Sequence, residues 1–268
     1  MMKIHTTAVI SPGAGISEDC EIGPYAVIDE HVRIGSGTRI GAHTVIEGTT
    51  EIGKNNNISP FVTIGTPPQD IGYRGEDTRV AIGNNNIIRE YTTIHRATTK
   101  QDWVTVIGDN NYIMSYAHIA HDCVLGNNII MVNSATLGGH TSVGDHVTMS
   151  SFMASHQFVR IGAYAFISGL TGLPKDIPPY MMASGPRASL YGLNLVGLRR
   201  HGFSRGAITG LRKAYRIIWR ESSVIKDGIK RVKEEMEPFA ELDVLMDFLT
   251  AGSVRGITGG SRLKDEDH

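Results

Sequence analysis

Three short histidine-containing segments carry the clearest chemical signal in this sequence. They read AHIAHDC, LGGH and SHQF, and their polar and glycine residues are His118, His121, Asp122, Gly139, His140, His156 and Gln157. An imidazole near its ordinary pKa can take a proton from a hydroxyl group at neutral pH, and a neighbouring carboxylate can fix its tautomer. A backbone N–H directed at a developing oxyanion stabilises the transition state of acyl transfer. The segments therefore predict acyl transfer if the fold brings them together.

A six-residue repeat predicts the elements that position these side chains. Apolar residues occupy every sixth position from Ile4 to Ile64, from Ile82 to Ile94 and from Ile107 to Leu173, with Ser155 as the polar exception. Neither a helix nor simple strand alternation gives this period. Strands this short cannot bury an apolar face alone, so they must coil and stack, as in a parallel β-helix. A flat β-sandwich with regular turns is the alternative.

The repeat resembles that of the hexapeptide-repeat acyltransferases, whose fold is a left-handed parallel β-helix. The resemblance supplies the left hand and a triangular coil of about 18 residues. We expect this β-helix over residues 1–173 and a C-terminal α-helical domain over residues 174–268 with a frayed tail, so the fold class is mainly β with α. Two breaks in the repeat, at 65–79 and 95–104, predict loops that leave the coil. After Ser204, a candidate N-cap, three successive runs have a helical period.

Stacked coils place residue n beside residue n + 18, on strands about 4.8 Å apart. His121 is therefore expected beside Gly139, and Asp122 beside His140. Cys20 and Cys123 occupy inward positions of the repeat, so direct attack by the acceptor hydroxyl is preferred to a covalent acyl-enzyme. The alternatives are solvated surface histidines and a Zn²⁺ site like that of carbonic-anhydrase-type β-helices. The histidine spacing does not match that type, and we predict no metal and no bound cofactor.

The composition limits the classes of partner. The 268 residues carry 26 Lys and Arg against 27 Asp and Glu, so no chain-wide basic field favours nucleic acid. Two cysteines exclude a disulfide framework, and no apolar stretch reaches the roughly 18 residues of a transmembrane helix. We expect a cytoplasmic protein without a transmembrane segment or a nucleic-acid partner.

One segment is locally basic. Between Ile177 and Arg220 there is no Asp or Glu, but there are eight Lys and Arg residues. A solvated helix face is one interpretation. The absence of compensating acids favours a site for an acidic protein or for phosphates.

Over nearly its whole length the sequence is similar to the UDP-N-acetylglucosamine O-acyltransferase family, which begins lipid A biosynthesis. The similarity lies in the segments IGTPPQDIGYRGEDT, REYTTIHRAT, AHIAHDCVLGN, ATLGGHTSVGD, HQFVRIGAYAFISG, DIPPYMMASG and GLNLVGLRRHGFSR, in this order. It implies transfer of an (R)-3-hydroxyacyl chain from acyl carrier protein to the 3-hydroxyl of UDP-N-acetylglucosamine. It also implies a homotrimer with its sites between subunits.

The resemblance implies roles for individual residues. His121 is implied as the general base, Asp122 as the residue that orients it, and Gly139 as the oxyanion donor, in agreement with the coil spacing. The implied substrate contacts are Asp70, His118, His140, His156, Gln157, Asn194 and Arg200. The implied limit of the acyl groove is at Gly169 and Arg187. The basic residues implied as the docking site for acyl carrier protein are Arg199, Arg200, Arg205, Arg212, Lys213, Arg216 and Arg220.

Four positions depart from the best-known family members: Gly72 replaces a Lys, Arg187 a His, Val196 a Glu, and His201 a second basic residue. Gly72 and His201 reduce the positive charge available to phosphates. Arg187 can shorten the acyl groove or lie clear of it.

Three other functions remain open from the sequence. One is transfer onto a 3-amino UDP-sugar, which the same base can serve. Another is the later N-acyltransferase of the pathway, which needs an N-terminal uridine-binding domain, for which a repeat starting at Ile4 leaves no room. The third is a non-catalytic β-helix that binds a partner.

Overall fold

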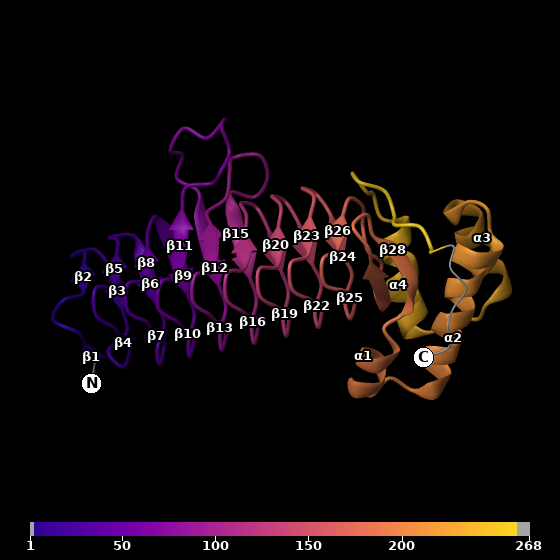
Figure 1. Cartoon of the computed structure of the whole chain (residues 1–268), viewed down its shortest axis with the longest axis horizontal. Coiled ribbons are helices and arrows are strands. Elements are labelled where there is room, and N and C mark those ends of the chain that lie inside the picture. Colours follow the sequence, from indigo (N-terminus) through magenta and orange to yellow (C-terminus); the bar gives the residue numbers. More distant parts are fainter. Residues whose placement is uncertain (1–2, 262–268) are drawn as a thin grey trace.

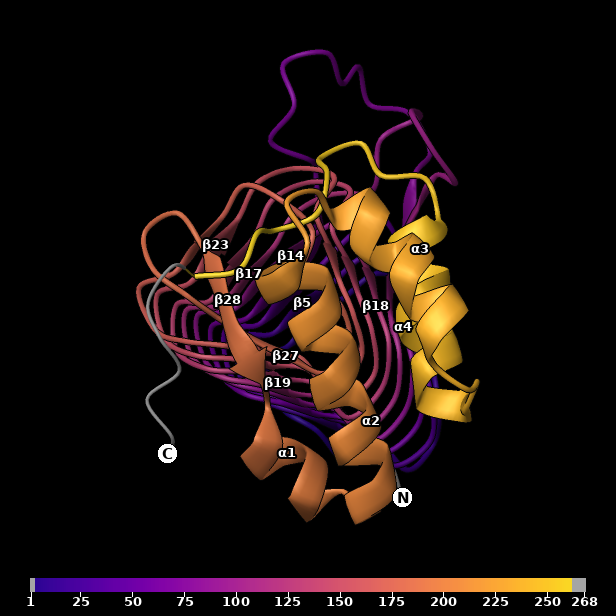
Figure 2. The same cartoon turned by 90° about the vertical axis from the view of Figure 1, so that its right-hand side faces the viewer.

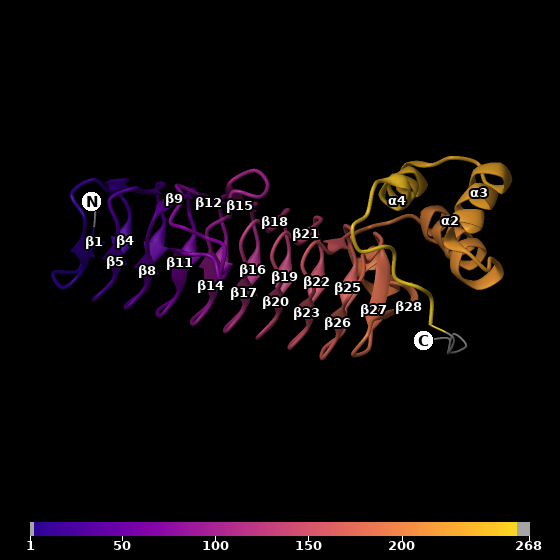
Figure 3. The same cartoon turned by 90° about the horizontal axis from the view of Figure 1, so that it is seen from above.

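The computed structural model describes residues 3–261. A long coil of short strands is followed at one end by a group of helices (Figures 1 and 3). None of the helices in this part of the chain is long and apolar enough to cross a lipid bilayer.

The strands form three sheets, which are the walls of the coil. The first wall contains β1 (Lys3–Ile4), β4 (Glu21–Ile22), β7 (Arg39–Ile40), β10 (Asn57–Ile58), β13 (Ile87–Ile88), β16 (Tyr112–Ile113), β19 (Ile130–Met131), β22 (Thr148–Met149), β25 (Phe166–Ile167), β27 (Met181–Ser184) and β28 (Ser189–Leu193). The second contains β2 (Val9–Ile10), β5 (Val27–Ile28), β8 (Val45–Ile46), β11 (Thr63–Thr66), β14 (Thr93–His95), β17 (His118–Ile119), β20 (Thr136–Leu137), β23 (Ala154–Ser155) and β26 (Gly172–Leu173). The third contains β3 (Gly15–Ile16), β6 (Val32–Ile34), β9 (Thr49–Ile52), β12 (Arg79–Ile82), β15 (Val104–Ile107), β18 (Val124–Leu125), β21 (Ser142–Val143) and β24 (Arg160–Ile161).

The register confirms the expected coil. Ile4 pairs with Ile22 and Ile22 with Ile40, both in parallel ladders, so each residue pairs with the one three repeats later. Seen from the C-terminal end in Figure 2, β17, β18 and β19 follow one another clockwise as the chain approaches the viewer. The coil is therefore left-handed, as the resemblance implied.

Residues of the six-residue repeat point into the coil and form one continuous apolar core. Ile28, Ile46 and Ile64, for example, are fully buried on consecutive coils. Polar core positions are hydrogen-bonded from coil to coil: the Asn86 side chain donates to Asn56 Oδ1 at 3.0 Å and accepts from the Asn111 N–H at 2.8 Å. Buried amides of this kind fix the register because leaving them unpaired costs about 1–3 kcal/mol each.

Two insertions explain the predicted loops. Thr63 pairs with Thr93 and Thr93 with His118, so these two coils contain more of the chain than the regular coils do. The surplus leaves the coil as loops 67–78 and 96–103, between β11 and β12 and between β14 and β15. Both loops project from the edge between the second and third walls (Figure 1).

The parallel ladder continues beyond the expected boundary at residue 173. Ile177 pairs with Ile161 and Ala183 with Ile167, so the last coil is slightly shorter than the regular ones. The inward residue after Leu173 is Ile177, only four positions later instead of six. The six-residue pattern therefore could not predict this last coil. β28 then closes the first wall by pairing antiparallel with β27.

The three predicted helical runs form helices. They are α2 (Arg205–Arg216), which continues as the π-helix η1 (Ile217–Glu221), α3 (Ile225–Glu235) and α4 (Ala240–Thr250). Ser204 caps α2 by accepting a hydrogen bond from the Ala207 N–H at 3.0 Å. A further helix, α1 (Leu195–Arg200), is too short to show a period in the sequence.

The prediction of a frayed C-terminal tail is wrong for residues 252–261. The Thr258 N–H donates to the Asp176 carbonyl at 2.9 Å, and the Ser261 N–H donates to the Leu190 carbonyl at 2.7 Å. Trp219 Nε1 donates to the Thr258 carbonyl at 3.1 Å. Backbone hydrogen bonds hold this segment, and they require no regular spacing of apolar residues. The sequence, rich in Gly and Ser, therefore gave no sign that the segment is ordered. The remainder of the predicted tail, 262–268, lies outside the described residues.

Candidate active site

The predicted catalytic residues meet at the edge between the second and third walls. His121 and Asp122 form the corner between β17 and β18, and Gly139 and His140 form the equivalent corner one coil later. The His140 N–H donates to the His121 carbonyl at 3.0 Å. The His121 ring covers Gly139 so closely that a Cβ there would lie 2.4 Å from His121 Cε1. The neighbours expected from the coil spacing therefore do lie side by side.

His121 and Asp122 form a buried pair. His121 Nδ1 lies 2.8 Å from Asp122 Oδ2, which also accepts hydrogen bonds from the Thr98 N–H at 3.0 Å and the Thr98 hydroxyl at 2.7 Å. Burial alone would raise the pKa of Asp122, but the hydrogen bonds from His121 and Thr98 hold it below its ordinary value. An ionised carboxylate at Nδ1 favours the tautomer with its proton on Nδ1, and this assignment leaves Nε2 as the basic nitrogen.

That basic nitrogen faces the Gly139 backbone. A Cβ on Gly139 would lie 2.7 Å from His121 Nε2. Among the residues described here, none accepts a hydrogen bond from the Gly139 N–H, while the Gly139 carbonyl accepts one from the Phe158 N–H at 3.0 Å. A base and an available N–H donor thus lie within a few ångströms, as acyl transfer requires.

His140 flanks the pair on the next coil. Its ring stacks on Phe158, with centroids 4.3 Å apart, and meets the His121 ring edge-on at 5.1 Å. His140 Nε2 lies 3.6 Å from Asp122 Oδ2, and Nδ1 is hydrogen-bonded to the Gln101 side chain. Burial lowers the pKa of His140, so its ring is neutral at neutral pH.

His118 lies on the second wall beside a histidine that sequence reasoning missed. His118 Nδ1 is hydrogen-bonded to the Thr93 hydroxyl at 2.7 Å, and its ring meets the His95 ring edge-on at 4.9 Å. Burial lowers the pKa of His118, and it lowers the pKa of His95 to about 4. His95 was visible in the segment REYTTIHRAT, but its neighbour follows only from the altered register of this longer coil.

Asp70 comes from the first loop and is held by the second. The Lys100 ammonium forms an ion pair with Asp70 Oδ2, and the Gly72 N–H donates to Oδ1 at 2.7 Å. The hydrogen bond from Lys100 lowers the pKa of Asp70. Arg96 ties the two loops together by donating to the Tyr73 hydroxyl at 2.8 Å. Lys100 was not predicted, because no pattern in the sequence indicates that the loops touch.

His156 and Gln157 are exposed on the coil that follows Gly139. A Cβ on Gly138 would lie 2.9 Å from the backbone nitrogen of Gln157, so the segment with His156 and Gln157 borders the catalytic corner. Ser155, the polar exception in the six-residue repeat, lies in the same corner and accepts a hydrogen bond from the Gly138 N–H at 3.0 Å. The Ser155 hydroxyl therefore satisfies a backbone N–H that an apolar side chain at this position would leave without this partner.

Four predicted site residues lie away from His121 in a single chain. Asn194 caps α1, where Oδ1 accepts from the Gly197 N–H at 3.0 Å, and Arg200 ends that helix. α1 is at the opposite edge of the coil from the two loops (Figures 1 and 2). Gly169 is exposed at the edge between the first and second walls, and Arg187 is exposed in the turn between β27 and β28.

Two departures from the family pattern lie with α1. The His201 ring packs 4.6 Å from the His146 ring and 5.2 Å from that of Tyr164, so it anchors the end of the helix to the coil. Val196 is exposed.

Other chemistry at the site has less structural support. Burial raises the pKa of Cys123 to about 12 and also raises that of Cys20, so neither thiol is an activated nucleophile. His121, Asp122 and His140 offer ligand atoms within 4.8 Å of one another, a set able to hold a metal ion. The Nδ1 atoms of both histidines are already hydrogen-bonded to protein side chains.

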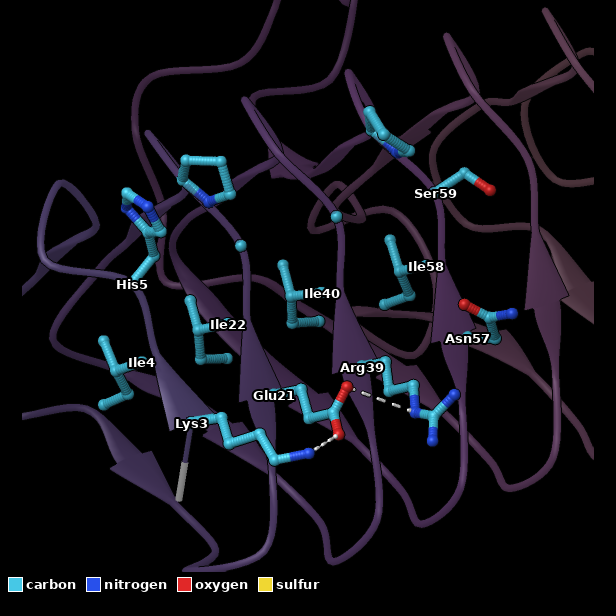
Figure 4. Close-up of a pocket in the computed structure, with 14 residues that line it drawn as sticks. Lys3, Ile4, His5, Glu21, Ile22, Arg39, Ile40, Asn57, Ile58 and Ser59 are labelled. Carbon is cyan, nitrogen blue, oxygen red and sulfur yellow. Dashed lines mark hydrogen bonds and ion pairs between the residues drawn. The ribbon is translucent and has the colours of Figure 1, made fainter. Parts of the chain in front are cut away.

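Two of the hollows on the described part of the surface bear on where a ligand could bind. One of about 520 Å³ lies along the first strands of the first wall, remote from the loops, and its charged side chains pair with each other: Glu21 with Lys3 at 2.9 Å and with Arg39 at 3.5 Å (Figure 4). The other, of about 210 Å³, is bordered by Gln101, Asp122 and His140. Of these two hollows, formed by residues 3–261, the smaller adjoins the candidate active site.

Comparisons with known proteins agree with this geometry. The family profile described as Udp N-acetylglucosamine O-acyltransferase; Domain 2 matches residues 176–258, and the bacterial transferase hexapeptide profile matches 31–66 and 105–139. The acyl-[acyl-carrier-protein]–UDP-N-acetylglucosamine O-acyltransferases of Thermodesulfovibrio yellowstonii and Thiobacillus denitrificans are 55% and 50% identical to this chain, and each alignment covers 96% of this chain and 99% of the relative. The solved UDP-N-acetylglucosamine acyltransferase from Campylobacter jejuni superposes with a TM-score of 0.90 at 38% identity, over 97% of this chain and 100% of the other.

Proposed function

This chain belongs to the UDP-N-acetylglucosamine O-acyltransferase family, and we propose that His121 and Asp122 carry out the chemistry of the family's reaction here. The enzyme transfers an acyl chain from acyl carrier protein to UDP-N-acetylglucosamine in lipid A biosynthesis. The proposal concerns how its own residues do so, which acceptor atom they activate and which partners they engage.

The first step is removal of a proton by His121. Nε2 takes the proton of the sugar 3-hydroxyl while that oxygen attacks the thioester carbonyl, and Asp122 stabilises the imidazolium that forms. General base catalysis of this kind contributes typically about 10²–10⁴-fold in rate. The observation that carries the proposal is the buried His121–Asp122 pair, whose free nitrogen faces Gly139.

The second step is collapse of the tetrahedral intermediate. Its oxyanion accepts a hydrogen bond from the Gly139 N–H, a contact worth about 3 kcal/mol in comparable enzymes. When the C–O bond has formed, the C–S bond breaks, and the departing thiolate of acyl carrier protein receives the proton from His121 Nε2. No acyl-enzyme is needed, in keeping with the buried state of Cys123. These residues balance the reaction without a metal or bound cofactor.

We further propose a homotrimer in which neighbouring chains complete each site. Asn194 and Arg200 are at the two ends of α1, which lies at the opposite edge of the coil from the corner between β17 and β18. They can therefore share a substrate with His121 only if they come from another copy. Phe152 and Leu170, on consecutive coils at the edge between the first and second walls, are 62% and 74% exposed. Apolar side chains repeated along one edge favour burial against a second copy.

The docking surface proposed for acyl carrier protein is the basic face of α1 and α2. Arg199, Arg205 and Arg212 are exposed and form no ion pair with any residue from 3 to 261. Arg216 pairs with Glu221 at 2.9 Å, and Lys213 donates to the Glu235 carbonyl at 3.4 Å. The free cations match the strongly acidic surface expected of the carrier protein.

The acyl chain is proposed to be a long (R)-3-hydroxyacyl group that passes Gly169. This exposed glycine puts no side chain on its edge, and an added Cβ would meet the Ser151 carbonyl oxygen at 3.3 Å. Arg187 is exposed, and its side chain has no hydrogen bond or ion pair with the described residues. It can therefore swing clear of the chain.

The test is a product analysis by mass spectrometry. The enzyme is dialysed against EDTA and incubated with UDP-N-acetylglucosamine and 3-hydroxyacyl carrier proteins of graded length. One dominant 3-O-acylated product is expected, at a rate that added Zn²⁺ or Mg²⁺ does not raise. Product only with a 3-amino UDP-sugar would replace the acceptor, and activity only after metal addition would overturn the metal-free mechanism. The cytoplasmic location expected from the sequence stays a prediction.

A further inference from the structure

The second loop holds three residues of the active site at once. Thr98 donates two hydrogen bonds to Asp122, Lys100 pairs with Asp70, and Gln101 bonds His140. These partners come from three different corners or loops of the fold, separated from the second loop by up to 39 residues. The segment 98–101 therefore links three parts of the candidate active site to one another.

The contact of Gln101 determines how His140 is oriented. A neutral imidazole carries one N–H, and the ionised Asp122 lies 3.6 Å from His140 Nε2, so the proton is favoured on Nε2. Nδ1 then has to accept a hydrogen bond. Gln101 Oε1 is the atom at Nδ1 in the structure, and turning the carboxamide end over places its N–H at that nitrogen instead, where it can donate.

We propose that Gln101 is a positioning residue for acyl transfer, which keeps His140 turned with its Nε2–H toward Asp122. This inference rests on the proposed function. Through His140, Gln101 supports the Asp122 carboxylate that orients His121. Gln101 itself touches no reacting atom.

The charges around His140 determine what a changed residue 101 would do. Asp122 and His121 face it from the preceding coil, Lys100 from the second loop and Asp70 from the first loop. Asp102 of the second loop and Arg160 of the following coil line the same hollow, and Arg160 is paired with Asp176 at 2.7 Å. Lys100 and Asp70 compensate each other in an ion pair. Asp122 is therefore the uncompensated charge nearest to His140, and a second carboxylate at position 101 would favour the imidazolium.

The experiment measures kcat and kcat/KM as functions of pH for Gln101→Glu. A protonated His140 would neutralise Asp122, so the acidic limb of the profile is expected to move up by about one pH unit. The rate should fall by a few-fold near neutral pH, by up to tenfold on the acidic side of the limb, and recover when the pH is raised. Gln101→Met, which removes the hydrogen bond without adding charge, should lower kcat by a few-fold and leave the limb in place.

Asp243→Asn is the charge control, because Asp243 is exposed on α4, outside the hollow beside His140, and its side chain has no hydrogen bond or ion pair with the described residues. Unfolding temperatures of the variants separate loss of folding from loss of positioning. A wild-type rate and pH profile in Gln101→Glu would overturn this inference alone. Full activity in His121→Ala would overturn the proposed function instead, whatever residue 101 does.

Discussion

At the residue scale, the proposed chemistry depends on one imidazole ring, the two residues that contact it, and Thr98, which holds one of them. Asp122 holds Nδ1 of His121, Gly139 lies against Nε2, and Thr98 fixes Asp122 from outside the coil. Asp122, Gly139 and the edge-on ring of His140 therefore fix where the His121 ring lies. Small changes in this packing should affect the rate more than they affect folding.

Gly139→Ala tests this packing. The added Cβ would overlap the His121 ring at 2.4–2.7 Å, so the imidazole must move from its place. We expect kcat to fall by at least about 10²-fold, because misplacing a base by 1 Å is already costly. Gly259→Ala, where an added Cβ meets nothing within 4 Å, is the control and should keep the wild-type rate. An active Gly139→Ala would exclude this arrangement.

The sequence predicted some of these residues better than others. His121, Asp122 and Gly139 followed from the fixed spacing between stacked coils, which needs no knowledge of loops. Thr98, Lys100 and Gln101 could not be predicted, since their partners lie 24, 30 and 39 residues away with no periodic relation. Contacts made by an inserted loop depend on where it folds back, which no local pattern records.

At the element scale, the elements with a regular period could be predicted from the sequence, and those without one could not. Strands with a spacing of six were predicted through Leu173, and the next coil was missed because the step to Ile177 is shorter than the repeat. The helices α2, α3 and α4 were predicted from their periods, whereas the short helix α1 was not. Tail residues 252–261 looked frayed because backbone hydrogen bonds, not apolar side chains, hold them.

The end of β14 should make stability depend on pH. Burial lowers the pKa of His95 to about 4, whereas an unfolded histidine titrates at about 6.5. Between these values the unfolded chain binds a proton that the folded chain does not, so the free energy of unfolding should fall as the pH falls. Chemical denaturation at several pH values measures this slope.

His95→Leu removes this titratable group and fills the buried position with an apolar side chain. The slope between about pH 6.5 and 4 should become smaller in this variant. His31→Gln, at an exposed position, should keep the wild-type slope. Identical slopes in the wild type and His95→Leu would show that His95 is not buried as a neutral ring.

At the scale of the whole molecule, one chain brings together only part of the site. The catalytic corner and α1 lie at opposite edges of the coil, and a row of exposed apolar residues follows a third edge. The proposed trimer would account for both features if α1 of each chain lies beside the catalytic corner of a neighbouring chain.

Phe152→Asp tests the trimer. Phe152 has a φ of 60°, which aspartate tolerates. The change should therefore weaken association of the chains more than it lowers the stability of the fold. Light scattering should give three times 29.1 kDa, about 87 kDa, for the wild type and a smaller mass for the variant. Val244→Asp, on the exposed face of α4, should leave the mass unchanged. A monomeric, fully active wild type would contradict the shared site.

Arg212→Glu tests the docking of acyl carrier protein on α2. Reversing an exposed, unpaired charge should raise KM for the acyl carrier protein by several-fold and leave KM for UDP-N-acetylglucosamine unchanged. The difference should shrink at high salt, because salt screens exposed charges. Lys226→Glu, on α3 outside the basic face, is the matched control. Equal effects of the two variants would place the docking surface elsewhere.

The most direct test of the account is the single-turnover rate of His121→Ala with acyl carrier protein substrate and UDP-N-acetylglucosamine. Without the general base, the rate should fall by about 10³-fold or more, while the oligomeric mass and unfolding temperature stay at wild-type values. Acyl transfer at the wild-type rate by this folded variant would contradict the central claim that His121 activates the acceptor hydroxyl.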